Sequence, residues 1–198
     1  MVLNEVIKDR MRPIVDPFGE FLGRVGFTPN VLSSFGLGLG VLAGFLFALR
    51  PSQPYFAALA IIGCGFFDLL DGAVARATSR ILPGSFTDQT LDRISEIAIY
   101  SGIIYGGYHI SPTIVLLTLG LSMLVSYVVA KGESLEVKMS KLGIGDRADR
   151  LTGLILFAVL GYVWIAIYLN LVLAMIALAS RYSYITHDIK MRDQTSKA

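Results

Sequence analysis

The sequence is poor in cysteine, in histidine and in charge. Its 198 residues include one cysteine, Cys64, and two histidines, His109 and His187. A single cysteine excludes an intrachain disulfide, so Cys64 is interpreted as a packing residue. Neither histidine has a partner at the spacing of a metal-binding pair, so both are interpreted as residues near the membrane interface. The net charge of +2 is too small to indicate a nucleic-acid-binding protein.

Long apolar runs make up much of the sequence. Only 16% of the residues are charged, 54% are hydrophobic, and the mean hydropathy is +0.64. This composition is typical of an integral membrane protein. The runs and the breaks between them predict an all-α membrane bundle within a single domain, residues 1–198, whose six-helix transmembrane part covers residues 28–189. The six spans are expected at about residues 31–49, 55–79, 86–108, 113–130, 151–167 and 168–184.

Residues 1–27 have a different pattern, in which apolar residues are mixed with Lys8, Arg10 and Arg12. Their spacing roughly fits an amphipathic helix that lies at the membrane interface, with its basic residues toward lipid phosphates. Pro13 and Pro17 would bend or split such a helix. A poorly ordered terminus is the alternative interpretation.

The distribution of basic residues predicts the orientation in the membrane. Of the 17 lysines and arginines, only Arg50 falls in a loop on the side opposite the N-terminal segment. By the positive-inside rule, both termini of this multi-pass cell-membrane protein are expected in the cytoplasm.

Four aspartates interrupt the apolar runs. Asp68 and Asp71 are three residues apart, and Asp88 and Asp92 are four apart, so each pair would share one face of a helix. A predicted break at residues 82–84 makes the two helices antiparallel neighbours. Four close carboxylates repel one another unless protons or cations intervene, and oxygen ligands favour Mg²⁺ or Mn²⁺. The acids therefore predict a site for two divalent ions, an arrangement that suits phosphoryl chemistry. The predicted orientation in the membrane makes this site face the cytoplasm.

Two other interpretations of the acids remain open. They could cap helices or pair with nearby arginines, and they could line the ion pathway of a membrane cation transporter. The segment after the first pair favours phosphate chemistry, because Gly72 and Ala75 let a ligand approach the backbone and Arg76 offers a planar fork for a phosphate.

These residues resemble the signature of the CDP-alcohol phosphotransferases, which reads D-x2-D-G-x2-A-R and then, after a spacer, G-x3-D-x3-D. Its fixed positions are filled here by Asp68, Asp71, Gly72, Ala75, Arg76, Gly84, Asp88 and Asp92. The resemblance implies a membrane enzyme of phospholipid synthesis. Such an enzyme transfers a phosphatidyl or archaetidyl group from CDP-diacylglycerol or CDP-archaeol to the hydroxyl of a small polar acceptor and releases CMP.

The resemblance also implies roles for individual residues. The four aspartates would hold two Mg²⁺ or Mn²⁺ ions, and Asp92 would be the general base. A homodimer is the expected assembly. The CDP-lipid would contact Asp68, Asp71, Gly72, Ala75, Arg76 and Gly84. In the family, a turn at the place of Thr28, Pro29 and Asn30 lies near the nucleotide, so these residues are further candidates for contacts with the CDP-lipid. The alternative is that they only begin a helix.

A second polar stretch spans residues 131–150, and its simplest interpretation is a solvated cytoplasmic loop. It is also similar to the region that binds the acceptor in the inositol-phosphate-accepting branch of the family. A cluster of basic residues would bind a phosphorylated acceptor through charge-assisted hydrogen bonds. Inositol phosphate is therefore the preferred acceptor, and glycerol 3-phosphate and serine are the alternatives. The candidate residues in this stretch are Lys131, Lys138, Arg147 and Arg150, and Arg181 in the last span is a further candidate.

Overall fold

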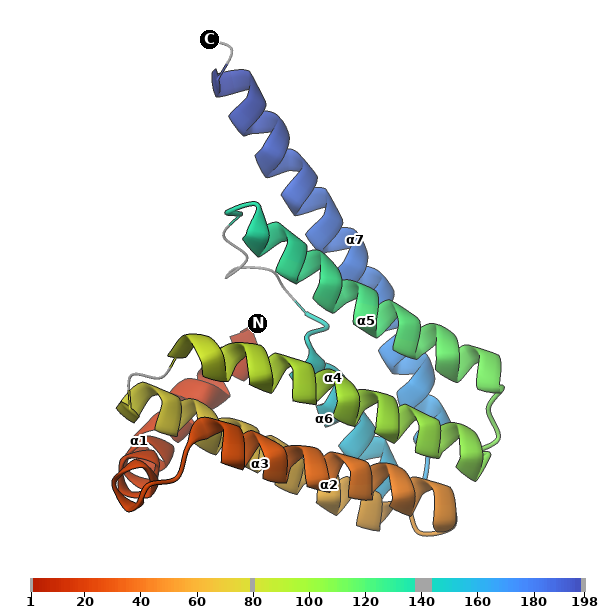
Figure 1. Ribbon diagram of the computed structural model, residues 1–198. Helices are drawn as coiled ribbons and strands as arrows, with labels where there is room; N and C mark the ends of the chain where they lie inside the picture. The colour runs from red at the N-terminus through yellow and green to blue at the C-terminus, as the bar shows by residue number, and fades with distance from the viewer. Residues whose placement is uncertain (1, 79–80, 138–143, 197–198) are drawn as a thin grey trace.

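The computed structural model describes residues 2–78, 81–137 and 144–196, and these residues form helices and no strand. The prediction of an all-α fold is therefore confirmed for this part of the chain. Figure 1 shows the seven helices in chain order. They are α1 (Val2–Val25), α2 (Pro29–Leu49), α3 (Tyr55–Thr78), α4 (Ile81–Gly106), α5 (Pro112–Ser134), α6 (Arg147–Val159) and α7 (Val163–Ser196).

The helices form two groups that α6 joins. Helices α2, α3 and α4 pack against one another, whereas α5 packs along α7 (Figure 1). Helix α6 contacts both α3 and α7, and α4 contacts α5. The start of α6 thereby reaches the same region as the acidic halves of α3 and α4.

Four of the described helices are long and apolar enough to cross a membrane: α2, α3, α5 and α7. Helix α4 has sufficient length, but it carries Asp88, Asp92, Arg93 and Glu96, and α6 has only 13 residues. The protein is therefore a membrane protein by composition and helix length, and the count of six spans stays a prediction.

Two predicted boundaries are wrong. The last two helices separate at residues 160–162 and not near residues 168–170, because Gly161 adopts a positive φ of 81° and ends α6. The break placed at residues 82–84 is also displaced, since α4 already begins at Ile81. Pro83 and Gly84 lie in the first turn of α4, where a proline is tolerated because no intrahelical donor is needed there.

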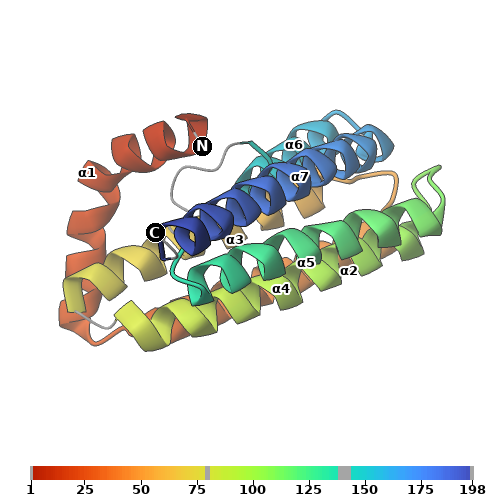
Figure 2. The same cartoon turned by 90° about the horizontal axis from the view of Figure 1, so that it is seen from above.

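The N-terminal segment is helical, as predicted, from Val2 to Val25. Pro13 and Pro17 lie inside this helix, which bends without being split (Figure 2). Several of its apolar side chains are exposed, among them Ile14 and Phe21. Its place at the membrane interface remains a prediction that these exposed side chains favour.

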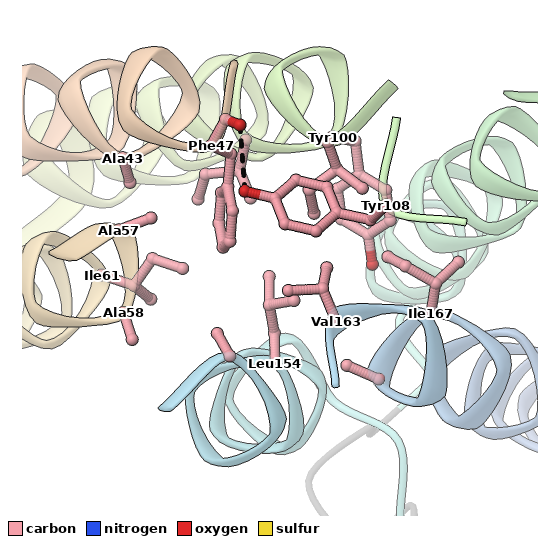
Figure 3. Packing of buried hydrophobic residues seen from close by; sticks show 14 of the residues in the cluster. Ala43, Phe47, Ala57, Ala58, Ile61, Tyr100, Tyr108, Leu154, Val163 and Ile167 are labelled. Carbon is pink, nitrogen blue, oxygen red and sulfur yellow. Dashed lines mark hydrogen bonds between the residues drawn. The ribbon is translucent and has the colours of Figure 1, made fainter. Parts of the chain in front are cut away.

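The main hydrophobic core lies in the half of the bundle that is remote from the aspartates. It combines Phe47 from α2, Ile61 from α3, Leu154 from α6 and Tyr108, which follows α4 (Figure 3). The Tyr108 hydroxyl donates a hydrogen bond of 2.9 Å to the Phe47 carbonyl oxygen, and the two rings meet edge to face. This core holds the helices of the bundle together.

Glycines bring α2 and α4 into direct backbone contact. A Cβ atom on Gly44 would overlap the carbonyl oxygen of Ala98, and one on Gly102 would overlap the backbone of Gly44. Small residues of this kind allow close packing between membrane helices. This contact fixes α4, and with it Asp88 and Asp92, relative to the other helices.

The Gly44 contact gives a first prediction. We expect Gly44→Ala to destabilise the protein by about 1–3 kcal/mol, because the added methyl group must displace the backbone of α4. Gly38→Ala on the same helix is the matched control, since nothing lies within 4 Å of its added Cβ. Alanine favours a helix by up to about 1 kcal/mol over glycine, so the control should be neutral or stabilising. Thermal unfolding in detergent measures both, and equal midpoints would contradict the packing account.

Candidate active site and metal centre

Three of the four predicted metal ligands meet between α3 and α4. Asp68 comes from α3, and Asp88 and Asp92 come from consecutive turns of α4. Each offers a carboxylate oxygen, and these three oxygens lie within 4.8 Å of one another. All three side chains are half-buried. Three hard oxygen donors in an accessible cluster fit a divalent ion such as Mg²⁺ or Mn²⁺.

Asp71 is placed differently from the other three aspartates. It is buried on α3, and its Oδ2 accepts a hydrogen bond of 2.6 Å from the Ser33 hydroxyl of α2. The same hydroxyl contacts the carbonyl oxygen of Pro29 at 3.0 Å. Ser33 therefore connects the start of α2, where Thr28 is the N-cap residue, to the aspartate motif. The predicted role of Asp71 as a metal ligand stays a prediction.

Ser33 was not among the predicted site residues, although its position offered a signal. Ser33 lies one helical turn after Pro29 at the start of an apolar helix, and its partner Asp71 is 38 positions away. A buried hydroxyl in such a helix needs a hydrogen-bond partner, but its identity depends on how α2 packs on α3.

Arg147 reaches the acidic cluster from the first turn of α6. Its Nη1 lies 2.6 Å from Oδ2 of Asp92, and its Nη2 donates a hydrogen bond of 3.2 Å to the Ser95 hydroxyl. The side chain is 13% exposed. A predicted acceptor-binding residue is thus in direct contact with the predicted general base.

Arg150, one turn further along α6, is buried in a network of charges. Its Nη2 contacts Oε1 of Glu96 at 3.2 Å, and its Nη1 donates a hydrogen bond of 2.7 Å to the Gly145 carbonyl. The other oxygen of Glu96 contacts Nη1 of Arg93 at 2.9 Å. The same Arg93 atom donates a hydrogen bond of 2.7 Å to the Ser126 hydroxyl of α5. Helices α4, α5 and α6 therefore converge on Glu96.

Glu96 was also not among the predicted site residues, although it lies four residues after Asp92 on the same face of α4. Its side chain is 1% exposed, so its negative charge requires partners. A glutamate one turn beyond the aspartate motif, between isoleucines, was the signal that the sequence offered.

Two further predicted acceptor residues, Arg181 and Lys131, lie in different surroundings. Arg181 of α7 is buried and contacts the carboxylate of Asp146, which is the N-cap residue of α6. Lys131 is exposed near the end of α5. Lys138 lies outside the described residues.

The predicted CDP-lipid residues lie around the second half of α3. Arg76 is half exposed, and its Nη2 lies 2.5 Å from Oδ1 of Asp16 on α1. Gly72 and Ala75 lie on the same helix, and Gly84 lies in the first turn of α4. Asp16 is a further residue that the sequence analysis missed, because 60 positions separate it from its partner.

A family model described as CDP-alcohol phosphatidyltransferase matches residues 27–183 of the sequence. The chain belongs to this family. The match includes all eight positions of the signature and the three clustered carboxylates. The protein is therefore an enzyme, a CDP-alcohol phosphatidyltransferase.

Similar members of the family act in inositol lipid synthesis. The chain is 31% identical over 176 residues to an archaetidylinositol phosphate synthase of Pyrococcus horikoshii, covering 88% of this chain and 92% of that protein. It is 29% identical over 212 residues to a phosphatidylinositol phosphate synthase of Streptomyces avermitilis, covering 100% of this chain and 85% of that protein. These relatives come from archaea and bacteria and share nearly the whole length of this phosphatidyltransferase.

Solved structures show the same fold. The phosphatidylinositol phosphate synthase of Mycobacterium tuberculosis with CDP-DAG bound matches with a TM-score of 0.70 and 28% identity, over 87% of this chain and 94% of that one. The structure in complex with manganese and citrate matches with a TM-score of 0.73 and 26% identity, over 86% of this chain and 88% of that one. The fold of this phosphatidyltransferase is thus the fold of an enzyme that has been seen with a CDP-lipid and with a divalent metal.

Proposed function

We propose that this enzyme transfers a phosphatidyl or archaetidyl group from a CDP-linked lipid to a hydroxyl of inositol phosphate and releases CMP. The observation that carries the proposal is the cluster of Asp68, Asp88 and Asp92, whose oxygens lie within 4.8 Å of one another inside the family signature. The names of the similar relatives support inositol phosphate as the acceptor over glycerol 3-phosphate or serine.

The clustered aspartates would hold the divalent ions, Mg²⁺ or Mn²⁺, with Asp71 joining Asp68, Asp88 and Asp92. When bound, such ions supply positive charge that neutralises the diphosphate and stabilises the attacking and leaving oxygens. The manganese complex of the tuberculosis synthase supports this choice of ions.

Asp92 would act as the general base. The acceptor hydroxyl oxygen attacks the β-phosphorus of the CDP-lipid, and the bond from this phosphorus to the oxygen of CMP breaks. The hydroxyl proton passes to Asp92, and CMP leaves with the bonding electrons. The contact of Arg147 with Oδ2 of Asp92 supports this role, because the ion pair would keep the carboxylate oriented toward the site where the acceptor binds.

The nucleotide end of the CDP-lipid would lie along α3 and the start of α2. Arg76 would bind the diphosphate through its guanidinium fork, and the small residues of the signature, Gly72, Ala75 and Gly84, would leave room for the cytidine. The Ser33 contacts with Asp71 and with the Pro29 carbonyl support the inclusion of the turn at Thr28, Pro29 and Asn30, because they place that turn beside the aspartate motif.

The acceptor phosphate would bind on the side of the cluster formed by α6. Arg147 is the best-placed candidate, because it touches Asp92 and would bring the acceptor hydroxyl close to the base. Arg150 and Arg181 would contribute from beside it, where they also contact Glu96 and Asp146. The proposed set of acceptor-binding residues remains Lys131, Lys138, Arg147, Arg150 and Arg181.

The membrane arrangement completes the proposal. Six spans would place both termini and the acidic cluster on the cytoplasmic side, where a membrane-bound CDP-lipid meets a soluble acceptor. Helix α1 would lie on that surface as an amphipathic segment. The enzyme would act as a homodimer.

The test is CMP release by the purified enzyme in lipid or detergent. CDP-diacylglycerol or CDP-archaeol is supplied with Mg²⁺ or Mn²⁺, and inositol 1-phosphate, glycerol 3-phosphate and serine are compared. We expect release with inositol 1-phosphate that EDTA abolishes and added Mn²⁺ restores. Release with another acceptor alone would correct the acceptor, and no release with any of them from folded protein would contradict the proposal.

A further inference from the structure

The N-terminal helix reaches the candidate active site through one ion pair. Asp16 of α1 contacts Arg76 of α3, with 2.5 Å between Oδ1 and Nη2. Both side chains are partly exposed, at 42% and 47%. The proposed function assigns Arg76 to the diphosphate, whereas it gives Asp16 no role and α1 only a place on the membrane surface.

Close packing holds α1 on α3 beside this ion pair. A Cβ atom on Gly19 would overlap Ala73 of α3, and one on Gly23 would lie 3.1 Å from the Thr78 side chain. Val15, the neighbour of Asp16, is buried in a small apolar cluster with residues of α2 and α3. Figure 2 shows α1 crossing the end of α3. The helix contact therefore sets the position of Asp16, independently of the ion pair.

The ion pair leaves one side of the Arg76 guanidinium turned toward the aspartate motif. Asp16 contacts Nη2, whereas Nη1 lies beside Gly72, where an added Cβ atom would be 3.4 Å away. Gly72 directly follows Asp71 in the signature. A guanidinium has five N–H groups in a rigid plane, so a carboxylate on one side fixes the direction in which the others point.

We propose that Asp16 is a positioning residue for the CDP-lipid, which holds the guanidinium of Arg76 over Gly72 so that its other N–H groups meet the diphosphate. This inference rests on the proposed function, in which Arg76 binds that diphosphate. Without Asp16, a half-exposed arginine side chain samples several rotamers, and each binding event must order it again. Helix α1 is then part of the nucleotide site as well as a surface helix.

The experiment compares Asp16→Asn, Asp16→Glu and the control Glu20→Gln. Glu20 lies one turn further along the same helix and pairs with the exposed Arg24 at 3.6 Å. For Asp16→Asn we expect the KM for the CDP-lipid to rise about fivefold, the effect of a partly exposed charge pair. The inhibition constant of free CDP, which carries the diphosphate without lipid tails, should rise by the same factor. Asp16→Glu should recover most of the loss, while kcat and the acceptor KM should stay unchanged.

A second comparison separates positioning from a merely structural role. In an Arg76→Ala background, Asp16→Asn should add nothing to the loss of CDP binding, because the group that Asp16 orients is gone. The proposal would be overturned if Asp16→Asn weakened CDP binding as much in the Arg76→Ala background as in the wild-type enzyme. It would also be overturned if Asp16→Asn alone left the KM for the CDP-lipid unchanged. A wild-type enzyme that releases no CMP from any CDP-lipid would contradict the proposed function, and direct CDP binding by the same variants would still decide the role of Asp16.

Discussion

Asp92→Asn is expected nearly to abolish transfer, with CMP release lowered by about 10²–10⁴-fold, while the protein still binds metal and CDP-lipid. A positioned general base contributes about 10²–10⁴-fold, and asparagine has no basic oxygen that could take the acceptor proton at neutral pH. Asp68 and Asp88 remain in the cluster and keep most of the negative charge. The expected result is therefore a loss in kcat with a much smaller change in the KM for the CDP-lipid.

The control for this variant is Asp188→Asn. Asp188 of α7 is also paired with an arginine, Arg192, at 2.7 Å, but neither residue belongs to the acidic cluster. The control should therefore retain wild-type turnover. Turnover retained in Asp92→Asn would contradict the role of Asp92 as base, and a parallel loss of metal binding would make Asp92 chiefly a ligand.

Glu96→Gln is expected to lower the free energy of unfolding by about 3 kcal/mol or more. Removal of one partner from a buried ion pair typically costs about 3–5 kcal/mol, because the other partner keeps its charge without compensation. Glu96 is 1% exposed and contacts both Arg93 and Arg150. Glutamine would leave two cations facing each other across an amide.

The measurement for Glu96→Gln is thermal unfolding in detergent, with Glu20→Gln as the matched control. Glu20 pairs with Arg24 in an exposed position, and such surface pairs contribute about 0–1 kcal/mol. A shift in Glu96→Gln no larger than in the control would show that the network around Glu96 does not stabilise the fold. We also expect the variant to lose activity. The contact of Glu96 with Arg150 fixes the first turn of α6 on α4, and Arg147 reaches Asp92 from the same turn.

The aspartate cluster could be predicted because it depends on residues that are close together in the sequence. Spacings of three and four residues place side chains on one helix face whatever the rest of the fold does. Two helices joined by a short connection must then lie close to each other. The structure brings Asp68 together with Asp88 and Asp92, as these two facts predict. Asp71, three residues from Asp68, instead accepts a hydrogen bond from Ser33.

The partners of these residues could not be predicted in the same way. Ser33, Asp16 and Glu96 act on Asp71, Arg76 and Arg150 across 38, 60 and 54 positions of sequence. These contacts depend on which faces of the helices pack together. Small residues at the faces determine this packing, and the periodicity of the apolar residues does not predict it. Gly19 against Ala73 and Gly44 against Ala98 are two such places.

The boundary between α6 and α7 shows a different limit. Residues 151–184 form an almost continuous apolar run in which only Gly161 changes the direction of the chain. Hydropathy marks such a run but does not mark its turn, so the predicted boundary fell about seven residues too late. A glycine at residue 161 was the local signal, since a positive φ favours glycine at the end of a helix.

The central claim is that carboxylates of α3 and α4 form the metal centre of this phosphatidyltransferase. Its most direct test is anomalous diffraction at the manganese edge from crystals of the enzyme grown with Mn²⁺. The account predicts an anomalous peak among the carboxylates of Asp68, Asp88 and Asp92, absent from crystals of the Asp68→Asn/Asp88→Asn double variant. A peak at another place, or no peak in the wild-type protein at saturating Mn²⁺, would contradict it.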